Sequence, residues 1–144
     1  MYTITEASIL DLNALHRLEK ICFPQDAWPL LDLIAVLTFP NVVRLKATIN
    51  GQMVGFIAGD PHPGEQIGWI ATVGVLPENR GKGIGQALIE DCEKRMSLPK
   101  VRLSVRMDNK EAIALYERLG YSRINIWQHY YNDGGSAIVM EKFR

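Results

Sequence analysis

Residues 73–88 of this chain read Val-Gly-Val-Leu-Pro-Glu-Asn-Arg-Gly-Lys-Gly-Ile-Gly-Gln-Ala-Leu, and this stretch decides the fold. The apolar run of residues 67–75 predicts a central strand that is buried on both faces. Gly81 follows, and Gly83 and Gly85 open an amphipathic run that predicts a helix over residues 83–96. Glycines let a ligand approach the backbone closely, and the free N–H groups of a helix N-terminus favour an anion. The segment therefore predicts a strand, a loop that cradles a pyrophosphate, and a helix.

Three types of pyrophosphate-binding loop follow a strand and open a helix, and their sequence requirements can be compared with this segment. A Walker loop requires Ser or Thr directly after its lysine, but here Gly83 follows Lys82. A dinucleotide fingerprint requires G-x-G-x-x-G, and no register of these glycines places one at the third position. The third type, Arg/Gln-x-x-Gly-x-Gly/Ala, is matched by Arg80, Gly83 and Gly85.

A second motif lies at residues 109–121, which read Asn-Lys-Glu-Ala-Ile-Ala-Leu-Tyr-Glu-Arg-Leu-Gly-Tyr. Asn109 and Tyr116 are seven residues apart, almost two helical turns, so we expect them to share a helix face. Gly120 stands where a helix C-terminal glycine belongs. Together the two motifs resemble the acetyl-CoA loop and the second signature of the GCN5-related N-acetyltransferase (GNAT) superfamily, in the order of that family.

The C-terminal residues 127–140 add a closer resemblance within the family. They contain the paired Tyr130 and Tyr131, a short acidic-glycine turn and an Ala-x-x-Met strand, as in RimI-like ribosomal-protein alanine acetyltransferases. The resemblance covers about residues 66–142. It implies a single α/β (α+β) domain over residues 1–144, with a mixed, mostly antiparallel sheet flanked by helices in the order β-α-α-β-β-β-α-β-α-β-β.

Local patterns predict the elements of this order. Asn50-Gly51 between two apolar runs is a strong hairpin signal, and Ser8 can cap the first helix. The expected strands are 2–7, 42–49, 52–58, 67–75, 101–106, 121–129 and 136–142, the expected helices are 8–22, 30–39, 83–96 and the second motif, and a loop is expected at 60–66.

The resemblance implies acetyl transfer from acetyl-CoA to a primary amine by direct attack. The backbone of Val73 and Val75 would pair with the pantetheine arm as an added strand does. The N–H groups of residues 81–86 would hold the pyrophosphate, with charge from the neighbouring basic side chains. The complete set of expected cofactor-binding residues is Val73, Val75, Arg80, Gly81, Lys82, Gly83, Ile84, Gly85, Gln86, Asn109 and Tyr116.

The resemblance also implies catalytic roles. Tyr116 would be the general acid that protonates the leaving thiolate, and Tyr130 and Tyr131 would contact the acceptor. RimI-like enzymes carry Leu-Glu-Val-Arg on the fifth strand with the glutamate as proposed base, whereas residues 103–106 here read Leu-Ser-Val-Arg. Ser104 therefore stands at the base position, where it can orient a water but is a poor base itself. The other candidate bases, among which the sequence does not choose, are Glu65, Asp60, His129 and the Tyr130 hydroxyl.

A site without a carboxylate base favours one kind of acceptor. An α-amine with a pKa of about 7.7–8.0 is roughly one-third neutral at pH 7.5, whereas a lysine with a pKa of about 10.4 is neutral only about one time in a thousand. We therefore expect the α-amine of a protein N-terminus as acceptor. Two alternatives stay open: a small amine such as a polyamine, an amino acid or an aminoglycoside, or a non-catalytic module that binds acyl-CoA.

Composition narrows the remaining classes. The 144 residues suit one domain, and 16 Lys+Arg balance 16 Asp+Glu without a basic run, which argues against nucleic acid as a partner. No apolar run is long enough to span a membrane, and the N-terminus lacks a signal-peptide pattern, so we expect a cytoplasmic protein. No metal-ligand spacing occurs, and the two cysteines are expected as reduced thiols. The exposed edge strands leave a monomer and a homodimer both open.

Overall fold

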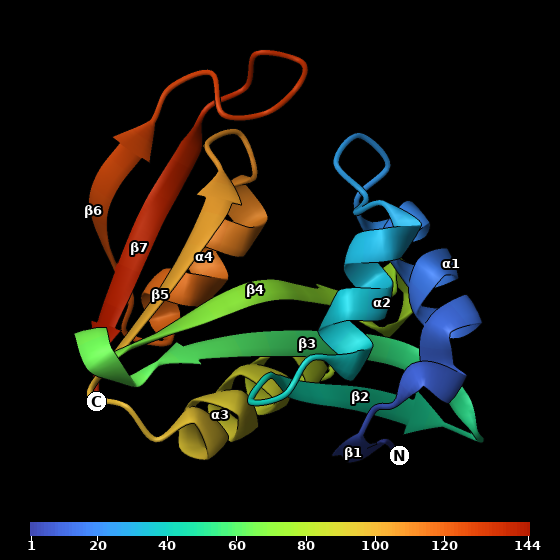
Figure 1. Ribbon diagram of the computed structural model, residues 1–144. Coiled ribbons are helices and arrows are strands. Elements are labelled where there is room, and N and C mark those ends of the chain that lie inside the picture. Colours follow the sequence, from blue (N-terminus) through green and yellow to red (C-terminus); the bar gives the residue numbers. More distant parts are fainter.

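The computed structural model describes all 144 residues as one seven-stranded sheet with four α-helices (Figure 1). The strand order is β1-β2-β3-β4-β5-β7-β6, and every neighbouring pair is antiparallel except β4 and β5. The strands are β1 Thr3–Glu6, β2 Val43–Ile49, β3 Gln52–His62, β4 Ile67–Val75, β5 Lys100–Arg106, β6 Ser122–Trp127 and β7 Ala137–Phe143. The helices are α1 Leu12–Cys22, α2 Leu30–Thr38, α3 Ile84–Met96 and α4 Lys110–Arg118, with short 3-10 helices η1 Ile9–Asp11, η2 Pro63–Glu65 and η3 Pro77–Asn79.

The predicted order of strands and α-helices is confirmed, with differences at element ends. β3 continues to His62, so most of the loop expected at 60–66 is strand followed by a 3-10 turn. β6 is shorter than the expected strand 121–129. Ser8 caps η1 rather than α1: its Oγ accepts from the N–H of Leu10 at 3.2 Å, and Asp11 returns a carboxylate to the Ser8 N–H at 2.9 Å.

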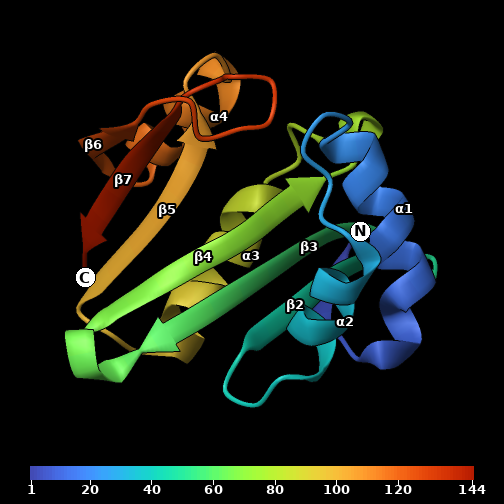
Figure 2. The same ribbon diagram turned by 45° about the horizontal axis from the view of Figure 1, so that its top comes forward.

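Helices cover both faces of the sheet (Figure 2). α1 and α2 enclose a smaller core with Phe56 and Ala58 of β3, while α3 packs on the other face against residues such as Ile57. This alternation follows from the two-residue period of a strand. A Cβ at Gly59 would lie 2.5 Å from the Cys92 Sγ, so α3 can pack this closely on β3 only because the residue is glycine.

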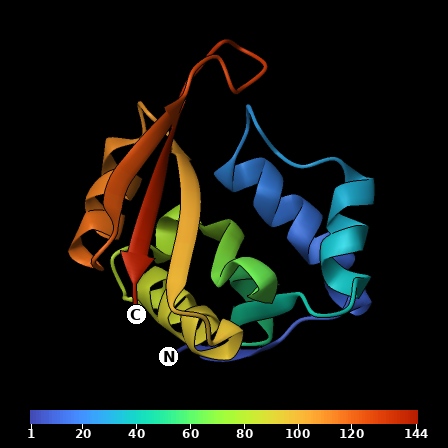
Figure 3. The ribbon, with the colours of Figure 1, turned by 60° about the vertical axis from the view of Figure 1, so that its left-hand side comes forward.

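The sheet divides where β4 meets β5. Only three residue pairs join these parallel strands, Ile67↔Lys100, Gly68↔Val101 and Trp69↔Arg102. Beyond them β4 and β5 diverge (Figure 1), and Figure 3 shows the two arms from the side, with β5, β7 and β6 on one side and α1 and α2 on the other. The residues of β4 after Trp69 therefore have a neighbouring strand only on the β3 side.

Candidate active site

The open edge of β4 exposes backbone groups of two predicted residues. The N–H of Leu76 donates to the Val54 carbonyl at 2.9 Å, so Leu76 bonds toward the strand that precedes β4. Because bonding direction alternates along a strand, Val73 and Val75 direct their N–H and C=O groups away from β3. The Val75 carbonyl accordingly accepts from Arg80 Nε at 2.9 Å and from Cys22 Sγ at 3.4 Å. The opening between β4 and β5 is thus lined by strand backbone that an extended ligand can pair with.

The loop after β4 has the backbone conformation of an anion cradle. Gly81 and Gly83 adopt φ of 80° and 82°, in the left-handed region that disfavours a side chain. A Cβ at either position would meet nothing within 4 Å, so open space lies beside both glycines. The first bond of α3 runs from the Ala87 N–H to the Gly83 carbonyl at 3.0 Å. The six N–H groups of residues 81–86 donate to no acceptor in the protein.

The two basic residues of the loop behave differently. Arg80 turns back to the Val75 carbonyl, so its guanidinium is engaged by strand backbone. Lys82 is exposed and forms no ion pair. Neither Arg80 nor Lys82 forms an ion pair, but only Lys82 is also without a hydrogen bond to the protein.

Tyr116 lies on α4 with its ring in the main core. It is 8% exposed and meets the ring of Tyr121 edge-on, with 6.1 Å between the centroids. Burial, and secondarily the neighbouring Tyr131, raises the pKa of Tyr116 to about 12. Its hydroxyl has no hydrogen-bond partner in the protein and is not sealed from solvent. The phenol is therefore protonated at neutral pH and free to donate.

Asn109 differs from its expected position. It is the N-cap of α4 rather than part of the helix, and its Oδ1 accepts from the Ala112 N–H at 3.2 Å. Asn109 still accepts a backbone bond of the helix, from the Ile113 N–H at 3.1 Å, so its shared face with Tyr116 stays a prediction. Capping occupies the side-chain oxygen and leaves the amide NH₂ able to donate to a ligand. Gly120 follows α4 with φ of 101°, as predicted for a C-terminal glycine.

The candidate bases are widely separated. Ser104 is half-buried on β5, on the face opposite the buried Val105, and forms no side-chain hydrogen bond. Asp60 pairs with Trp69, the third residue of β4, Glu65 precedes the strand, and both contact His62. The predicted cofactor loop follows the last residue of β4, roughly 20 Å from Trp69 and roughly 26 Å from Ile67 at strand spacing. The structure therefore brings neither carboxylate to the predicted site.

The loop between β6 and β7 carries the remaining predicted residues. Ring centroids are 5.2 Å apart for Trp127 and Tyr130 and 5.0 Å apart for Tyr130 and Tyr131. Tyr130 is 55% exposed, while burial raises the pKa of the half-buried Tyr131 to about 12. His129 is exposed in the same loop, with Nδ1 3.2 Å from the Gly134 carbonyl. Tyr130 and Tyr131 thus form one aromatic surface with Trp127 at the end of β6.

Sequence reasoning missed Glu19. This α1 residue is 1% exposed, and its two carboxylate oxygens accept from Thr72 Oγ1 at 3.0 Å and from the Trp28 N–H at 3.3 Å. Burial raises the pKa of Glu19 above its ordinary value. The spacing of Glu19 could have predicted its burial. It lies four residues after Leu15 and three before Cys22, which places it on the apolar side of the helix.

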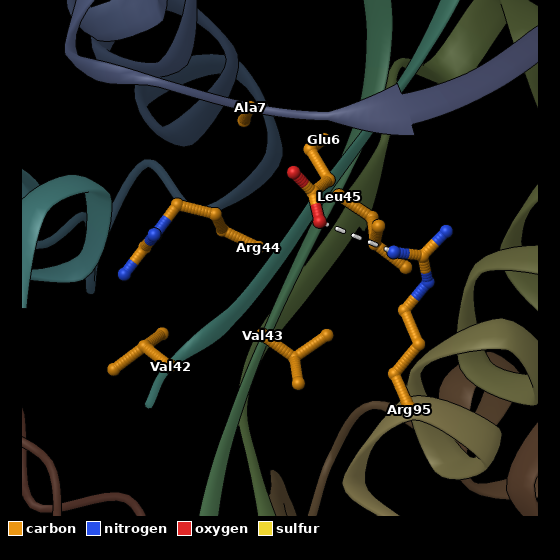
Figure 4. A pocket seen from close by; sticks show the side chains of 7 residues that line it. All are labelled: Glu6, Ala7, Val42, Val43, Arg44, Leu45 and Arg95. Atoms are coloured by element: carbon orange, nitrogen blue, oxygen red, sulfur yellow. Dashed lines mark hydrogen bonds and ion pairs between the residues drawn. The ribbon is translucent and has the colours of Figure 1, made fainter. Parts of the chain in front are cut away.

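A surface pocket elsewhere includes none of the predicted residues. It lies where β1 and β2 meet α3, and Glu6 and Arg95 form an ion pair of 3.4 Å at its edge (Figure 4). The lining comprises Glu6, Ala7, Val42, Val43, Arg44, Leu45 and Arg95. No three His, Cys, Asp or Glu side chains gather into a metal-binding group. None of the helices has the length and hydropathy needed to cross a bilayer.

Comparison with known proteins agrees with this geometry. Residues 12–121 match the model of the acetyltransferase (GNAT) family, and the chain belongs to that family. It is therefore an acetyltransferase. It is 28% identical over 153 aligned positions to an N-alpha-acetyltransferase of Sulfurisphaera tokodaii, covering 96% of this chain and 91% of the relative. An acetyltransferase of Pectobacterium atrosepticum is 34% identical, covering 80% of this chain and 84% of the relative.

The fold also matches a solved structure of a related enzyme. The ribosomal-protein-S18-alanine N-acetyltransferase from Escherichia coli superposes with a TM-score of 0.88 at 27% identity. The match covers 99% of this chain and 94% of that one. The predicted fold class and the RimI-like resemblance are thereby confirmed.

Proposed function

We propose that this acetyltransferase moves the acetyl group of acetyl-CoA to the free α-amine at the N-terminus of a protein or peptide. The observation that carries the proposal is the base-poor site: Ser104 stands at the base position, and the buried Glu19 is held by Thr72 and Trp28. Such a site suits an amine that is already partly neutral at physiological pH, which an α-amine is. The similarity to N-alpha-acetyltransferases supports the same acceptor.

The residues present fit acetyl-CoA. Six unpaired N–H groups in residues 81–86, at the N-terminus of a 13-residue helix, suit a pyrophosphate, and Lys82 adds positive charge. Val73 and Val75 offer strand backbone to the amides of the pantetheine arm. Asn109 can donate its amide NH₂ to the same arm. Arg80 must release the Val75 carbonyl before a ligand can pair there.

Acetyl-CoA supplies the thioester carbonyl that the amine attacks. The C–N bond forms as the C–S bond breaks, the nitrogen loses one proton, and the thiolate gains one. Tyr116 is the proposed donor to that sulfur. Because a phenol with a pKa of about 12 is a weaker acid than a thiol, whose pKa is about 8.5, full proton transfer from Tyr116 alone is uphill. We therefore propose that Tyr116 donates a hydrogen bond to the developing thiolate. The proton that the thiolate gains is the one that the attacking nitrogen loses.

The acceptor would enter beside the aromatic surface of the β6–β7 loop. Tyr130 is the more exposed of the two tyrosines, and Tyr131 lies deeper and close to Tyr116. Flat aromatic side chains of this kind can pack along a peptide backbone while their hydroxyls stay hydrated. Tyr130 and Tyr131 are accordingly the proposed acceptor-binding residues.

The test is a CoA-release assay with two sets of acceptors. One set holds short peptides with free Ala, Ser, Met or Gly N-termini and the same peptides with a blocked N-terminus. The other set holds spermidine, free amino acids and aminoglycosides. Release with free peptides that is lost on blocking supports α-amine transfer. Turnover confined to small amines would replace the proposed acceptor, and binding of acetyl-CoA without any turnover would favour a non-catalytic module.

A further inference from the structure

The opening between the two arms of the sheet is bridged by one ion pair. Arg106, the last residue of β5, donates from Nε and Nη2 to the carboxylate of Asp26, the Nη2 bond being 2.9 Å long. Asp26 lies in the loop 23–29, which connects α1 and α2 in the other arm. We call Arg106, Asp26, Asp133 and Tyr131 the Arg106 clasp.

The other two members of the clasp come from the β6–β7 loop. Asp133 Oδ1 lies 3.0 Å from Arg106 Nη2, and the guanidinium carbon lies 4.3 Å from the centroid of the Tyr131 ring. Both belong to the same arm of the sheet as Arg106. Asp26 is thus the one member of the clasp that comes from the other arm, so within the clasp only its bonds with Arg106 cross the opening.

The clasp is packed as well as charged. The side chains of Arg106 and Asp26 are 14% and 21% exposed, so water screens the pair only in part. A Cβ at Gly135 would lie 2.6 Å from Arg106 Nη1 and 3.1 Å from Asp133 Oδ1, so a side chain at this position would have to displace the guanidinium. The loop 23–29 is also held at its far end, where the Trp28 N–H donates to the buried Glu19.

We propose that Asp26 is a positioning residue for the acceptor. By bonding Arg106 it fixes the loop 23–29 across the opening between β4 and β5, and so sets the width of the passage that the acceptor amine must enter. Loss of this bond leaves the loop held near its two ends, by the Phe23 N–H on the Glu19 carbonyl and the Trp28 N–H on the Glu19 carboxylate, and leaves Tyr131 stacked on Arg106. This inference rests on the proposed acetyl transfer to an amine, but it concerns entry of the acceptor rather than the acceptor's identity.

The test compares Asp26→Asn with Asp133→Asn, which removes a carboxylate from the same guanidinium without breaking the link between the arms. We expect Asp26→Asn to raise the KM for the acceptor about tenfold while kcat and the KM for acetyl-CoA change less than about twofold. Asp133→Asn should change all three less than about twofold. Asp26→Glu, which keeps the carboxylate, should restore most of the acceptor KM.

A steric variant tests the same link without removing a charge. Gly135→Ala places a methyl group where the guanidinium lies and should raise the acceptor KM in the same direction as Asp26→Asn. Amide hydrogen exchange provides a second readout that needs no substrate: Asp26→Asn should speed exchange in residues 23–29 and leave residues 128–136 unchanged.

The outcomes separate the two proposals. If the wild-type protein acetylates only small amines, the proposed α-amine acceptor is overturned. The acceptor KM of the clasp variants is then measured with the small amine that is acetylated. An unchanged acceptor KM or unchanged exchange in the loop 23–29 of Asp26→Asn overturns the clasp. Equal loss of kcat and of acetyl-CoA affinity would also overturn it, because it would mark a general loss of structure.

Discussion

Arg80 folds back onto the strand that leads into its own loop, with Nε 2.9 Å from the carbonyl oxygen of Val75. This carbonyl points to the open side of β4, where the pantetheine arm is proposed to pair. The guanidinium therefore occupies an acceptor that the ligand needs, and binding must exchange one hydrogen bond for another. Cys22 also donates to this carbonyl from α1, which ties the end of β4 to the helix layer.

Replacement of Tyr116 by Phe should lower kcat about a hundredfold or more, which is the lower range for loss of a hydrogen-bond donor to charge that develops in the transition state. The fold should persist, because the ring stays in the core and the lost hydroxyl bonds nothing in the protein. Steady-state kinetics, thermal unfolding and acetyl-CoA binding measured together check this expectation. Unchanged turnover would remove Tyr116 from the chemistry.

The cradle glycines allow a matched comparison. Gly83 and Gly51 have φ of 82° and 78°, and a Cβ at either would meet nothing within 4 Å. Alanine at each should destabilise the protein by about 1–2 kcal/mol through left-handed backbone strain. Only Gly83→Ala should also weaken acetyl-CoA binding, by about tenfold or about 1.4 kcal/mol, because its methyl group faces the space beside the unpaired N–H groups.

Urea unfolding and calorimetric titration of both variants measure the two effects separately. Equal affinity for acetyl-CoA in Gly83→Ala and Gly51→Ala would contradict a role for this loop in binding.

Restoring a carboxylate at Ser104 should be tolerated. The side chain is half-buried and forms no hydrogen bond that the substitution would remove, and it shares its strand face with two cations, Arg102 and Arg106. Ser104→Glu should raise kcat/KM for amine acceptors by at least about tenfold below pH 7.5, where an added base has most ammonium to deprotonate. Ser104→Gln is the control of similar size without a base. A folded but inactive Ser104→Glu would show that this pocket differs from that of the RimI-like enzymes.

Stability should depend on pH through Glu19. Burial raises the pKa of Glu19 above its ordinary value of 4.5, so the folded state holds this proton more tightly than the unfolded state. The stabilisation that protonation provides is complete below pH 4.5 and is lost as the pH rises to the folded-state pKa.

The free energy of unfolding of the wild type relative to Glu19→Gln should therefore fall through that pH window and level off above it. Urea unfolding from pH 4 to pH 8 measures the difference. Glu117→Gln, at a carboxylate that is 48% exposed and pairs with Arg123, serves as the control for removal of a surface carboxylate. A constant difference between wild type and Glu19→Gln would contradict the raised pKa.

Local patterns predicted those parts of the fold that depend on neighbouring residues. The Asn50-Gly51 turn forms a hairpin with φ of 52° and 78°, and Val101, Leu103 and Val105 are buried on one face of β5. The end of β3 was missed because Pro61 is typical of a loop, whereas pairing with Gly68 of β4 keeps it in the strand. Tertiary pairing overrode local composition there.

The least predictable part of the candidate site depends on contacts between distant segments. Asp26 and Arg106 are 80 residues apart in sequence, and no periodicity of either segment signals that they meet. Thr72 and Glu19 are 53 residues apart, so the sequence could place Glu19 on the apolar side of its helix but could not predict its hydrogen bond with Thr72. The motifs predicted the strand, glycine loop and helix of the proposed cofactor site because this conformation is local, while the proposed acceptor side is assembled from distant segments.

The three-pair junction of β4 and β5 has a further consequence for the protein before it meets its ligand. Beyond Trp69 the strand carries unpaired backbone groups in the interior of a sheet, and such an edge can template association with another chain. Arg80 and Cys22 shield only the Val75 carbonyl. A bound molecule that pairs along β4 would act as a missing strand, and saturation at a hundred times its Kd would add about 2.7 kcal/mol of stability. The concentration of this ligand in the cell would then influence the fraction of the protein that aggregates.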